Sequence, residues 1–379
     1  QASGVRDSRP MYRRVPRFEP GDPAASEHLR TQGYAVFKGV LGPSECEEVL
    51  DLLFEWLGEV TGDRVRRGEV ATFDHWPPAI GSTGILPYCG IGQCEAQWRV
   101  RSAPRLRDAF AGIWGDPELI TSFDGVCLFR PWQQEESWKT QSGWFHVDQH
   151  PGKRLGFECV QGIVNLLEMD AGSGGNVLIP GSHLNFCNLA ERYPALVAAL
   201  PPIEDYFGIP PSDPQLAKPE GFLRAHLEAG DLLCWDSRTI HCNAPSTTGE
   251  SCSARYGLAR AVSMVCMVPR CRAPTEVLEA RRHAVAAQVS TSHLPHAFFP
   301  THEYNDWKQK FAEGAQNSYP AAPAMLNGLR WRLVGCAGDL AKADQEVGPA
   351  SAKRRKLCDE GGPCDLREAE SEAEELRSG

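Results

Sequence analysis

The chain has 379 residues, of which 42% are hydrophobic and 23% are charged, and its formal net charge is −10. A chain of this length and composition can form one large domain or two ordinary ones with a sizeable core. The acidic balance argues against binding nucleic acid across the whole surface, because phosphate backbones select basic proteins. No stretch approaches the ~20 apolar residues that span a bilayer, so the sequence predicts no transmembrane helix and no membrane partner.

Fourteen of the residues are cysteines, and none of them stands in a Cys-x-x-Cys pair. A zinc ribbon or a thioredoxin-type site is therefore not supported. Cys159, Cys234 and Cys266 lie within apolar runs, where cysteine usually acts as a small core hydrophobe. This use of cysteine indicates a reducing compartment, so we expect an intracellular protein, cytoplasmic or nuclear. The chain opens at Gln1 without Met or an apolar signal core, as a fragment or a processed end would.

The N-terminal part predicts an irregular segment followed by a strand and helices. Residues 1–25 are rich in Arg and Pro, lack periodicity, and are expected to be extended or disordered. Residues 34–37 predict a short strand. Ser44 and Glu47 have the spacing of a capping box, and apolar residues at i, i+3, i+4 and i+7 after them predict an amphipathic helix. Residues 104–114 predict another helix.

From about residue 120 the pattern changes to short apolar runs separated by Gly and Pro turns. Short strands with turn signals between them predict a β-sandwich or barrel, and a double-sheet jelly roll is one such architecture. A helix is predicted over residues 275–290. We expect a mainly β fold with flanking helices, forming a single domain over residues 26–335 with a barrel core at about 120–270. The predicted strands lie within residues 125–129, 159–167, 176–179, 231–235 and 260–268.

The C-terminal end differs in composition from the rest of the chain. Apolar residues thin out from residue 337, so residues 337–379 predict a disordered basic and acidic tail. A basic run in this tail matches a nuclear import signal that an import factor would bind, although such runs are also common in solvated tails without a function. Both interpretations stay open. The run consists of Lys353, Arg354, Arg355 and Lys356.

The segment around residue 146 carries the first candidate metal ligands. His146 and Asp148 are separated by one residue, and on a strand residues i and i+2 point to the same face. One imidazole and one carboxylate are two of the three ligands of an iron-binding facial triad. Alone, this pair is also compatible with a hydrogen bond at a strand end. The best candidate for the third ligand is His241, which follows an apolar strand and a polar turn, although a histidine there can also be an ordinary core residue.

A cosubstrate that carries a carboxylate needs a cation to hold it, and arginine binds carboxylates through two parallel hydrogen bonds. Arg260 heads an apolar run, where a buried cation needs a partner. That partner is either a bound dicarboxylate or a carboxylate of the protein. Arg255 is the second candidate for this clamp. Gln161 and Asn165 share one strand face among apolar neighbours, so both are candidate contacts of the cosubstrate or the substrate.

Other residues in these segments have two interpretations each. Trp144 and Trp235 either line the site or pack in the core. His150 is expected to lie outside the metal site, because a proline follows it and ends the strand. His183 is expected to shape a turn or border the site. Residues 292–296 follow the barrel as a lid or an external packing element, and the sequence assigns no chemistry to their histidines.

Four ordered segments carry a resemblance to a known enzyme family. Three of them are similar to the N-terminal entry, the central strand and turn, and the distal-histidine segment of the phytanoyl-CoA dioxygenase family. In that order, they are residues 33–41, residues 174–183 and residues 235–241. Arg260 matches the arginine at the head of that family's final core strand. The resemblance covers about residues 33–270.

This resemblance implies a double-stranded β-helix, which is a jelly-roll or cupin-like barrel with helices packed outside. It also implies an oxidoreductase that uses iron(II), 2-oxoglutarate and O2, in which the metal carries the chemistry and the protein orients the reactants. His146, Asp148 and His241 would be the metal ligands and catalytic residues. Arg260 or Arg255 would clamp 2-oxoglutarate.

The implied reaction is hydroxylation of a small organic substrate, with release of succinate and CO2. The presence of Asp148 favours hydroxylation over halogenation, because related halogenases have Gly or Ala at that position. Val147 stands between the two ligands where the enzymes of CoA esters often have a polar residue. The phytanoyl-CoA substrate is therefore not carried over to this chain, and the substrate stays unidentified.

Three alternative functions are compatible with parts of the pattern. A nucleic-acid demethylase uses a similar triad with paired distal arginines, but Arg255 and Arg260 have the wrong spacing and the chain is acidic, so a nucleic-acid partner is not expected. A catalytically silent barrel could act as a binding module, although an inactive barrel has no need to keep all three ligands. A metal-dependent cupin isomerase would usually have more histidine ligands on neighbouring strands.

Overall fold

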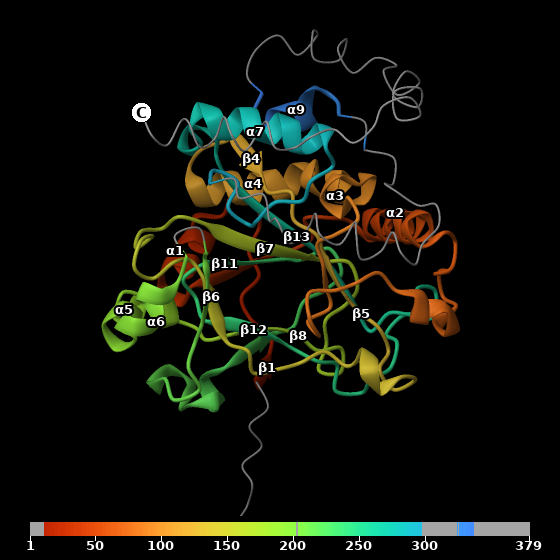
Figure 1. The fold of residues 1–379 in the computed structure, drawn as a ribbon, viewed down its shortest axis with the longest axis horizontal. Coiled ribbons are helices and arrows are strands. Elements are labelled where there is room, and N and C mark those ends of the chain that lie inside the picture. The colour runs from red at the N-terminus through yellow and green to blue at the C-terminus, as the bar shows by residue number, and fades with distance from the viewer. Residues whose placement is uncertain (1–10, 202–203, 298–323, 325, 337–379) are drawn as a thin grey trace, which may run out of the picture.

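The computed structural model describes residues 11–201, 204–297, 324 and 326–336, which form two sheets with helices outside them (Figure 1). The described helices include none that is long and apolar enough to cross a membrane. The predicted C-terminal tail and its basic run lie outside the described residues.

The two sheets have six and seven strands. The six-stranded sheet contains, in spatial order, β1 (Met11–Arg13), β10 (Leu223–Ala225), β8 (Gly175–Leu178), β12 (His241–Ala244), β6 (His146–Asp148) and β9 (Tyr206–Gly208). The seven-stranded sheet contains β2 (Tyr34–Phe37), β11 (Leu232–Asp236), β7 (Val160–Asn165), β13 (Arg260–Pro269), β5 (Val126–Phe129) and β3 (Ile85–Leu86), with β4 (Leu119–Thr121) paired to β13.

The path of the chain through these sheets is that of a double-stranded β-helix. From β5 to β8, and again from β11 to β13, successive strands alternate between the two sheets, while β9 and β10 form an insertion in the six-stranded sheet. The pairs β7–β13, β7–β11 and β8–β12 are all antiparallel. The predicted fold class, mainly β with flanking helices, is confirmed. The predicted strands of the barrel match β5, β7, β8, β11 and β13 to within two residues at each end.

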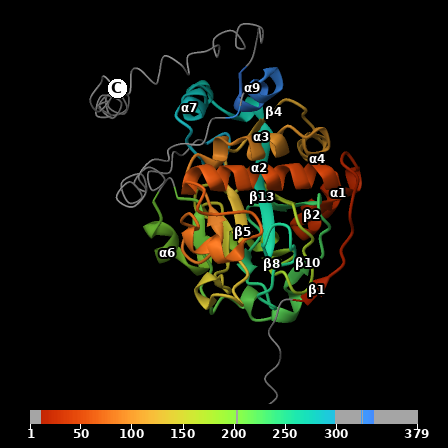
Figure 2. The same cartoon turned by 90° about the vertical axis from the view of Figure 1, so that its right-hand side faces the viewer.

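Most helices lie outside the seven-stranded sheet (Figures 1 and 2). Leu50, Leu53 and Leu57 of α2 belong to the same buried cluster as Val164 of β7 and Val265 of β13. Burial of these apolar side chains, at roughly 25 cal/mol per Å², holds the helices on the sheet. The helices are α1 (Pro23–Gln32), α2 (Pro43–Thr61), α3 (Glu95–Arg101), α4 (Pro104–Trp114), α5 (Asn188–Arg192), α6 (Pro194–Ala199), α7 (Thr275–Ala286) and α9 (Gly328–Val334).

Helix α2 begins two residues earlier than the capping box of Ser44 and Glu47 predicts. Pro43 occupies the first turn, so Gly42 is the N-cap. The main-chain N–H of Gly42 donates to Oε2 of Glu45 at 2.8 Å. The prediction was wrong about which residues cap the helix, because proline at the first helical position is itself a start signal.

The described part of residues 1–25 contains an extended strand, as expected, and the first residues of a helix, which was not expected. Within this part, β1 pairs in parallel with β10, and α1 begins at Pro23. Arg17 forms ion pairs with Glu228 at 2.6 Å and with the buried carboxylate of Asp231 at 2.8 Å. These partners lie about two hundred residues later in the chain, so local sequence patterns could not have indicated them. Strands β1, β2 and β3 also join the sheets from outside the predicted core range of 120–270.

Side chains from both sheets fill the space between them, here called the barrel interior. Its apolar part includes Ile163, Leu178, Leu233 and Val262, all almost fully buried. Because side chains alternate along a strand, the polar residues in register with this set also point inward. Those polar residues are His146, Asp148, Gln161, Asn165, Asn176, His241, Asn243 and Arg260.

Candidate metal centre

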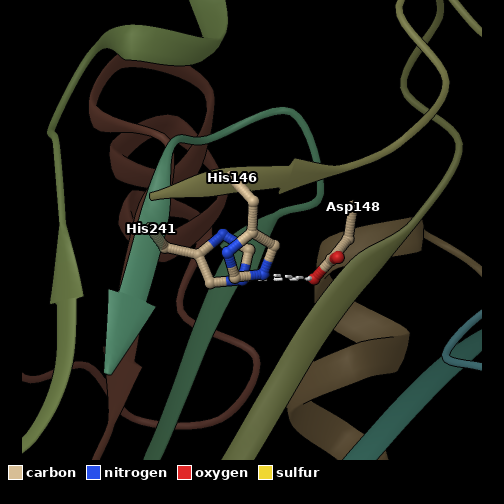
Figure 3. A group of neighbouring side chains, drawn as sticks. All are labelled: His146, Asp148 and His241. Atoms are coloured by element: carbon tan, nitrogen blue, oxygen red, sulfur yellow. Dashed lines mark ion pairs between the residues drawn. The ribbon is translucent and has the colours of Figure 1, made fainter. Parts of the chain in front are cut away.

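Three side chains from two neighbouring strands meet in the barrel interior. His146 and Asp148 project from the same face of β6, and His241 begins β12 directly opposite His146. Oδ2 of Asp148 lies 3.4 Å from Nε2 of His146 and 3.2 Å from Nε2 of His241. The three ligand atoms lie within 4.8 Å of one another, and Figure 3 shows the side chains converging. Two imidazoles and one carboxylate are the donor set of a non-haem iron centre, so these residues fit iron(II).

The main chain fixes both histidine rings. The Nδ1–H of His146 donates to the carbonyl oxygen of Trp144 at 3.1 Å, and that of His241 donates to the carbonyl oxygen of Thr239 at 2.9 Å. A carbonyl accepts only, so each ring must carry its hydrogen on Nδ1. Nε2 of each ring therefore points at Asp148, and once Nε2 gives up any proton that it shares with this carboxylate, the ring is in the tautomer that a metal ligand needs.

Electrostatics favour the protonation states that bind a metal. Burial by itself would raise the pKa of the Asp148 carboxyl, but the charge of His146 and hydrogen bonds from His146 and His241 hold it well below its ordinary value. Burial, together with the neighbouring charge of His146, lowers the pKa of His241. Asp148 is therefore ionised and His241 is neutral at pH 7, which are the forms that coordinate metals.

Gln161 and Asn165 have different surroundings. Nε2 of Gln161 donates to Oδ2 of Asp148 at 2.8 Å, so this side chain contacts the candidate metal ligand itself. Asn165 lies further along β7, opposite Val262. Its Nδ2 is 3.5 Å from the carbonyl oxygen of Leu227, and its buried Oδ1 has no hydrogen-bond partner.

Arg260 is a buried cation without a protein carboxylate as partner among the described residues. Arg260 is only 3% exposed, and this burial lowers the pKa of its guanidinium. Nη1 reaches Sγ of Cys127 and Oδ1 of Asn243, each at 3.4 Å, and Nε has no hydrogen-bond partner. The ring of Phe129 lies 4.9 Å below the guanidinium. Asn243 is two residues after His241 on β12, so the guanidinium and the metal centre share one strand face.

Arg255, the second candidate for the clamp, does not lie in the barrel interior. Its half-exposed guanidinium forms ion pairs with Glu47 at 2.8 Å and Asp51 at 2.7 Å, both on the outer helix α2. The structure therefore does not bring Arg255 together with the metal centre, because Arg255 precedes the final core strand and its charge is already balanced at the surface.

Comparison with known proteins agrees with this geometry. A model of the phytanoyl-CoA dioxygenase (PhyH) family matches residues 29–253, more than half of the chain. The chain belongs to this family. The family places it among the iron- and 2-oxoglutarate-dependent oxygenases, and the His-Asp-His group of the structure agrees with that class.

Individual relatives of this PhyH family chain are distant. Ava biosynthesis cluster protein O of Aspergillus versicolor is 26% identical over 282 residues, covering 71% of this chain and 85% of the relative. A solved structure of the Escherichia coli protein JW0805 is similar with a TM-score of 0.51 at 16% identity, covering 85% of each chain, and it shares the fold. The epimerase SnoN, solved with Fe3+ and alpha-ketoglutarate, is similar with a TM-score of 0.41 at 17% identity, covering 66% of this chain and 85% of SnoN.

Aromatic rings surround the two histidines of this PhyH family site. The rings of Trp144 and Tyr206 stack on His146 at centroid distances of 4.7 and 4.8 Å, and Trp235 lies 5.1 Å from His241. Tyr206 is 44% exposed. Sequence reasoning missed Tyr206, because β9 carries no strand signal of its own. Asn243 was also missed, although its i+2 spacing from His241 could have indicated it.

The other histidines considered have partners elsewhere. Nδ1 of His150 accepts from the main-chain N–H of Gly152 at 3.0 Å, and Nε2 of His183 donates to the carbonyl oxygen of Arg30 at 2.9 Å. Neither belongs to the group of metal-ligand atoms found among the described residues.

A glycine at the end of α1 touches the chain that holds His241. Gly33 has a φ of 80°, and its carbonyl oxygen accepts from Oγ1–H of Thr239 at 2.9 Å. A Cβ at this position would lie 2.5 Å from Oγ1 of Thr239 and 2.6 Å from Nδ1 of His183. Since the carbonyl of Thr239 holds the ring of His241, glycine at position 33 keeps this connection free of a steric clash.

Proposed function

We propose that this chain is a hydroxylase in which His146, Asp148 and His241 hold iron(II) and Arg260 holds 2-oxoglutarate, acting on a small organic substrate with release of succinate and CO2. The observation that carries the proposal is a metal-binding triad and a buried arginine without a carboxylate partner on one face of the same barrel interior. Bound iron with 2-oxoglutarate supplies oxidation by O2, and the protein residues supply binding and orientation.

The spacing of the two groups suits a short dicarboxylate. Two strand residues span about 6.6 Å, which is the step from His241 to Asn243, the contact of Arg260. A carboxylate beside Arg260 would provide the charge-assisted bonds that its Nε and the long 3.4 Å contacts of its Nη1 leave unmade. The other end of the ligand could then reach the metal. Buried apolar side chains of the interior lie beside these polar groups.

Two features favour hydroxylation of a small molecule. Asp148 leaves the metal with its full set of protein ligands, which disfavours halogenation. The Aspergillus relative is named for a biosynthesis cluster, which supports a small-molecule substrate of biosynthesis rather than a macromolecule. The demethylase alternative loses support because Arg255, which would have to pair with Arg260, is engaged at the surface.

The test is anaerobic titration of iron(II) and 2-oxoglutarate into the purified protein, followed by visible absorption of the metal–2-oxoglutarate chelate. We expect a chelate band in the wild type, no band in Asp148→Ala, and a weaker 2-oxoglutarate response in Arg260→Ala. Arg255→Ala is the matched control and should behave as the wild type. A folded wild type that gives no band would overturn the proposal in favour of a binding module. Succinate release under O2 then gives a substrate screen.

A further inference from the structure

The segment after α7 returns to the barrel beside the metal centre. Residues 289–297, here called the return segment, are tied to the connection between β4 and β5 by Thr291, whose N–H donates to the carbonyl oxygen of Phe123 at 3.1 Å and whose Oγ1 accepts from the N–H of Phe123 at 3.0 Å. Leu294 is fully buried against Cys159 and Cys266. The return segment is therefore packed onto the barrel along its length.

One side chain of the return segment contacts a candidate metal ligand directly. Nε2 of His293 lies 2.8 Å from the main-chain carbonyl oxygen of Asp148. A carbonyl accepts only, so Nε2 carries the hydrogen and donates it. The carbonyl oxygen of His293 in turn accepts from Sγ–H of Cys159 at 3.2 Å. His293 is thus held at its main chain while its ring holds Asp148.

Asp148 needs such support because of its place in the fold. It ends β6, a strand of three residues, and strand ends open more readily than strand centres. Its main-chain N–H donates to the carbonyl oxygen of Ser237 at 3.0 Å, and its carboxylate receives the bond from Gln161. The bond from His293 is the contact on its carbonyl oxygen, and together these three fix the peptide units on both sides of the ligand.

We propose that His293 is a positioning residue of the metal centre, which aims the carboxylate of Asp148 at the two imidazoles by holding its main-chain carbonyl. This inference rests on the proposed function for the identity of the metal. It assigns a role in the site to a segment that lies after the final barrel strand. Groups that orient ligands from outside the coordination shell typically change metal affinity by about 10–100-fold when removed.

The test compares His293→Ala, His293→Gln and His296→Ala in the full-length chain. Glutamine keeps an N–H donor of similar reach. His296 lies in the same return segment, with Nε2 3.4 Å from Oε2 of Glu158 and no contact with Asp148, so it reports on anchoring of the segment alone. Iron(II) affinity is measured anaerobically through the 2-oxoglutarate chelate band, together with thermal unfolding of the metal-free protein.

We expect His293→Ala to weaken iron(II) binding about tenfold or more, His293→Gln to restore most of the affinity, and His296→Ala to leave it unchanged. Equal losses of affinity in His293→Ala and His296→Ala, or an unchanged affinity in His293→Ala with only a lower Tm, would overturn the inference. A folded wild type that binds no iron would overturn the proposed function as well, so the two failures are distinguishable.

Discussion

The two ends of the barrel interior balance their charges in opposite ways. At the metal end, Asp148 has both histidines, Gln161 and His293 around it. At the other end, Arg260 has two contacts of 3.4 Å, and its Nε has no partner among the residues that the structure describes. An arrangement whose polar groups satisfy one another is preorganised before its ligand arrives, whereas a buried unpaired cation is completed only by an anion. The comparison shows a metal end whose polar groups are paired by the fold, and under the proposed function the arginine end would be completed by the cosubstrate.

Arg260→Met is the most direct test of this difference between the two ends, because it removes the buried cation. Truncating one partner of a buried charge pair costs roughly 2–5 kcal/mol, so the Kd for 2-oxoglutarate should rise about thirtyfold or more. Without 2-oxoglutarate the same variant should be more stable than the wild type, by about 1 kcal/mol, because an uncompensated buried charge is removed. Thermal unfolding with and without 2-oxoglutarate measures both effects. A ligand-free variant that is less stable would mean that Arg260 is already satisfied by the protein.

Titration of the buried Asp124 carboxyl tests whether charged groups near the metal end, other than the ligands themselves, are also balanced by their neighbours. Burial raises the pKa of its carboxyl from the ordinary 3.8 to about 6, against the lowering effect of nearby His293 and Arg101, and its Oδ1 has no hydrogen-bond partner in the described part of the chain. A carboxyl whose pKa is higher in the folded than in the unfolded state contributes to stability below pH 4, where it is protonated. This contribution is lost as the pH rises towards 6. Asp124→Asn should remove this dependence, with a difference from the wild type of at most about 3 kcal/mol.

The measurement for Asp124 is the free energy of unfolding from denaturant titrations between pH 4 and pH 7. The wild type should lose stability relative to Asp124→Asn across this window. Parallel curves for the two proteins would show that the carboxyl titrates normally.

Gln161→Ala tests how much the metal end depends on the hydrogen bond from Gln161. Loss of its hydrogen bond to Asp148 should weaken iron(II) binding about tenfold, as measured by the anaerobic chelate titration. Asn165→Ala is the matched control, since Asn165 lies on the same face of β7 without contacting the triad. Equal effects of the two variants on iron(II) affinity would remove Gln161 from the metal centre.

Arg255→Ala should have the smallest effect. Exposed ion pairs such as those with Glu47 and Asp51 contribute little to stability. The free energy of unfolding should fall slightly and less so at high salt, while 2-oxoglutarate affinity stays at the wild-type value. A weaker 2-oxoglutarate response in this variant would reopen the question of the clamp.

The sequence predicted the barrel strands and the pair of His146 and Asp148 because both depend on local periodicity, whereas His241 was predicted from its place after an apolar strand and turn and from the family resemblance. The i, i+2 spacing of His146 and Asp148 places them on one face of any strand, and the apolar runs mark the central strands. Partners distant in sequence were not predictable in this way. The pairing of β1 with β10, the surface position of Arg255 and the bond from His293 all depend on which segments the fold brings together. Tyr206 was missed because β9 carries no strand signal of its own.

We expect Gly33 to be needed for function, although it is not one of the residues around the metal. A library of single substitutions scored for turnover should show position 33 grouped with the metal ligands, although it lies at the end of a helix and more than a hundred residues before His146. Any side chain there displaces Thr239, whose carbonyl orients the ring of His241. Interpretation of natural variants by their distance in sequence from the ligands would therefore misjudge this position.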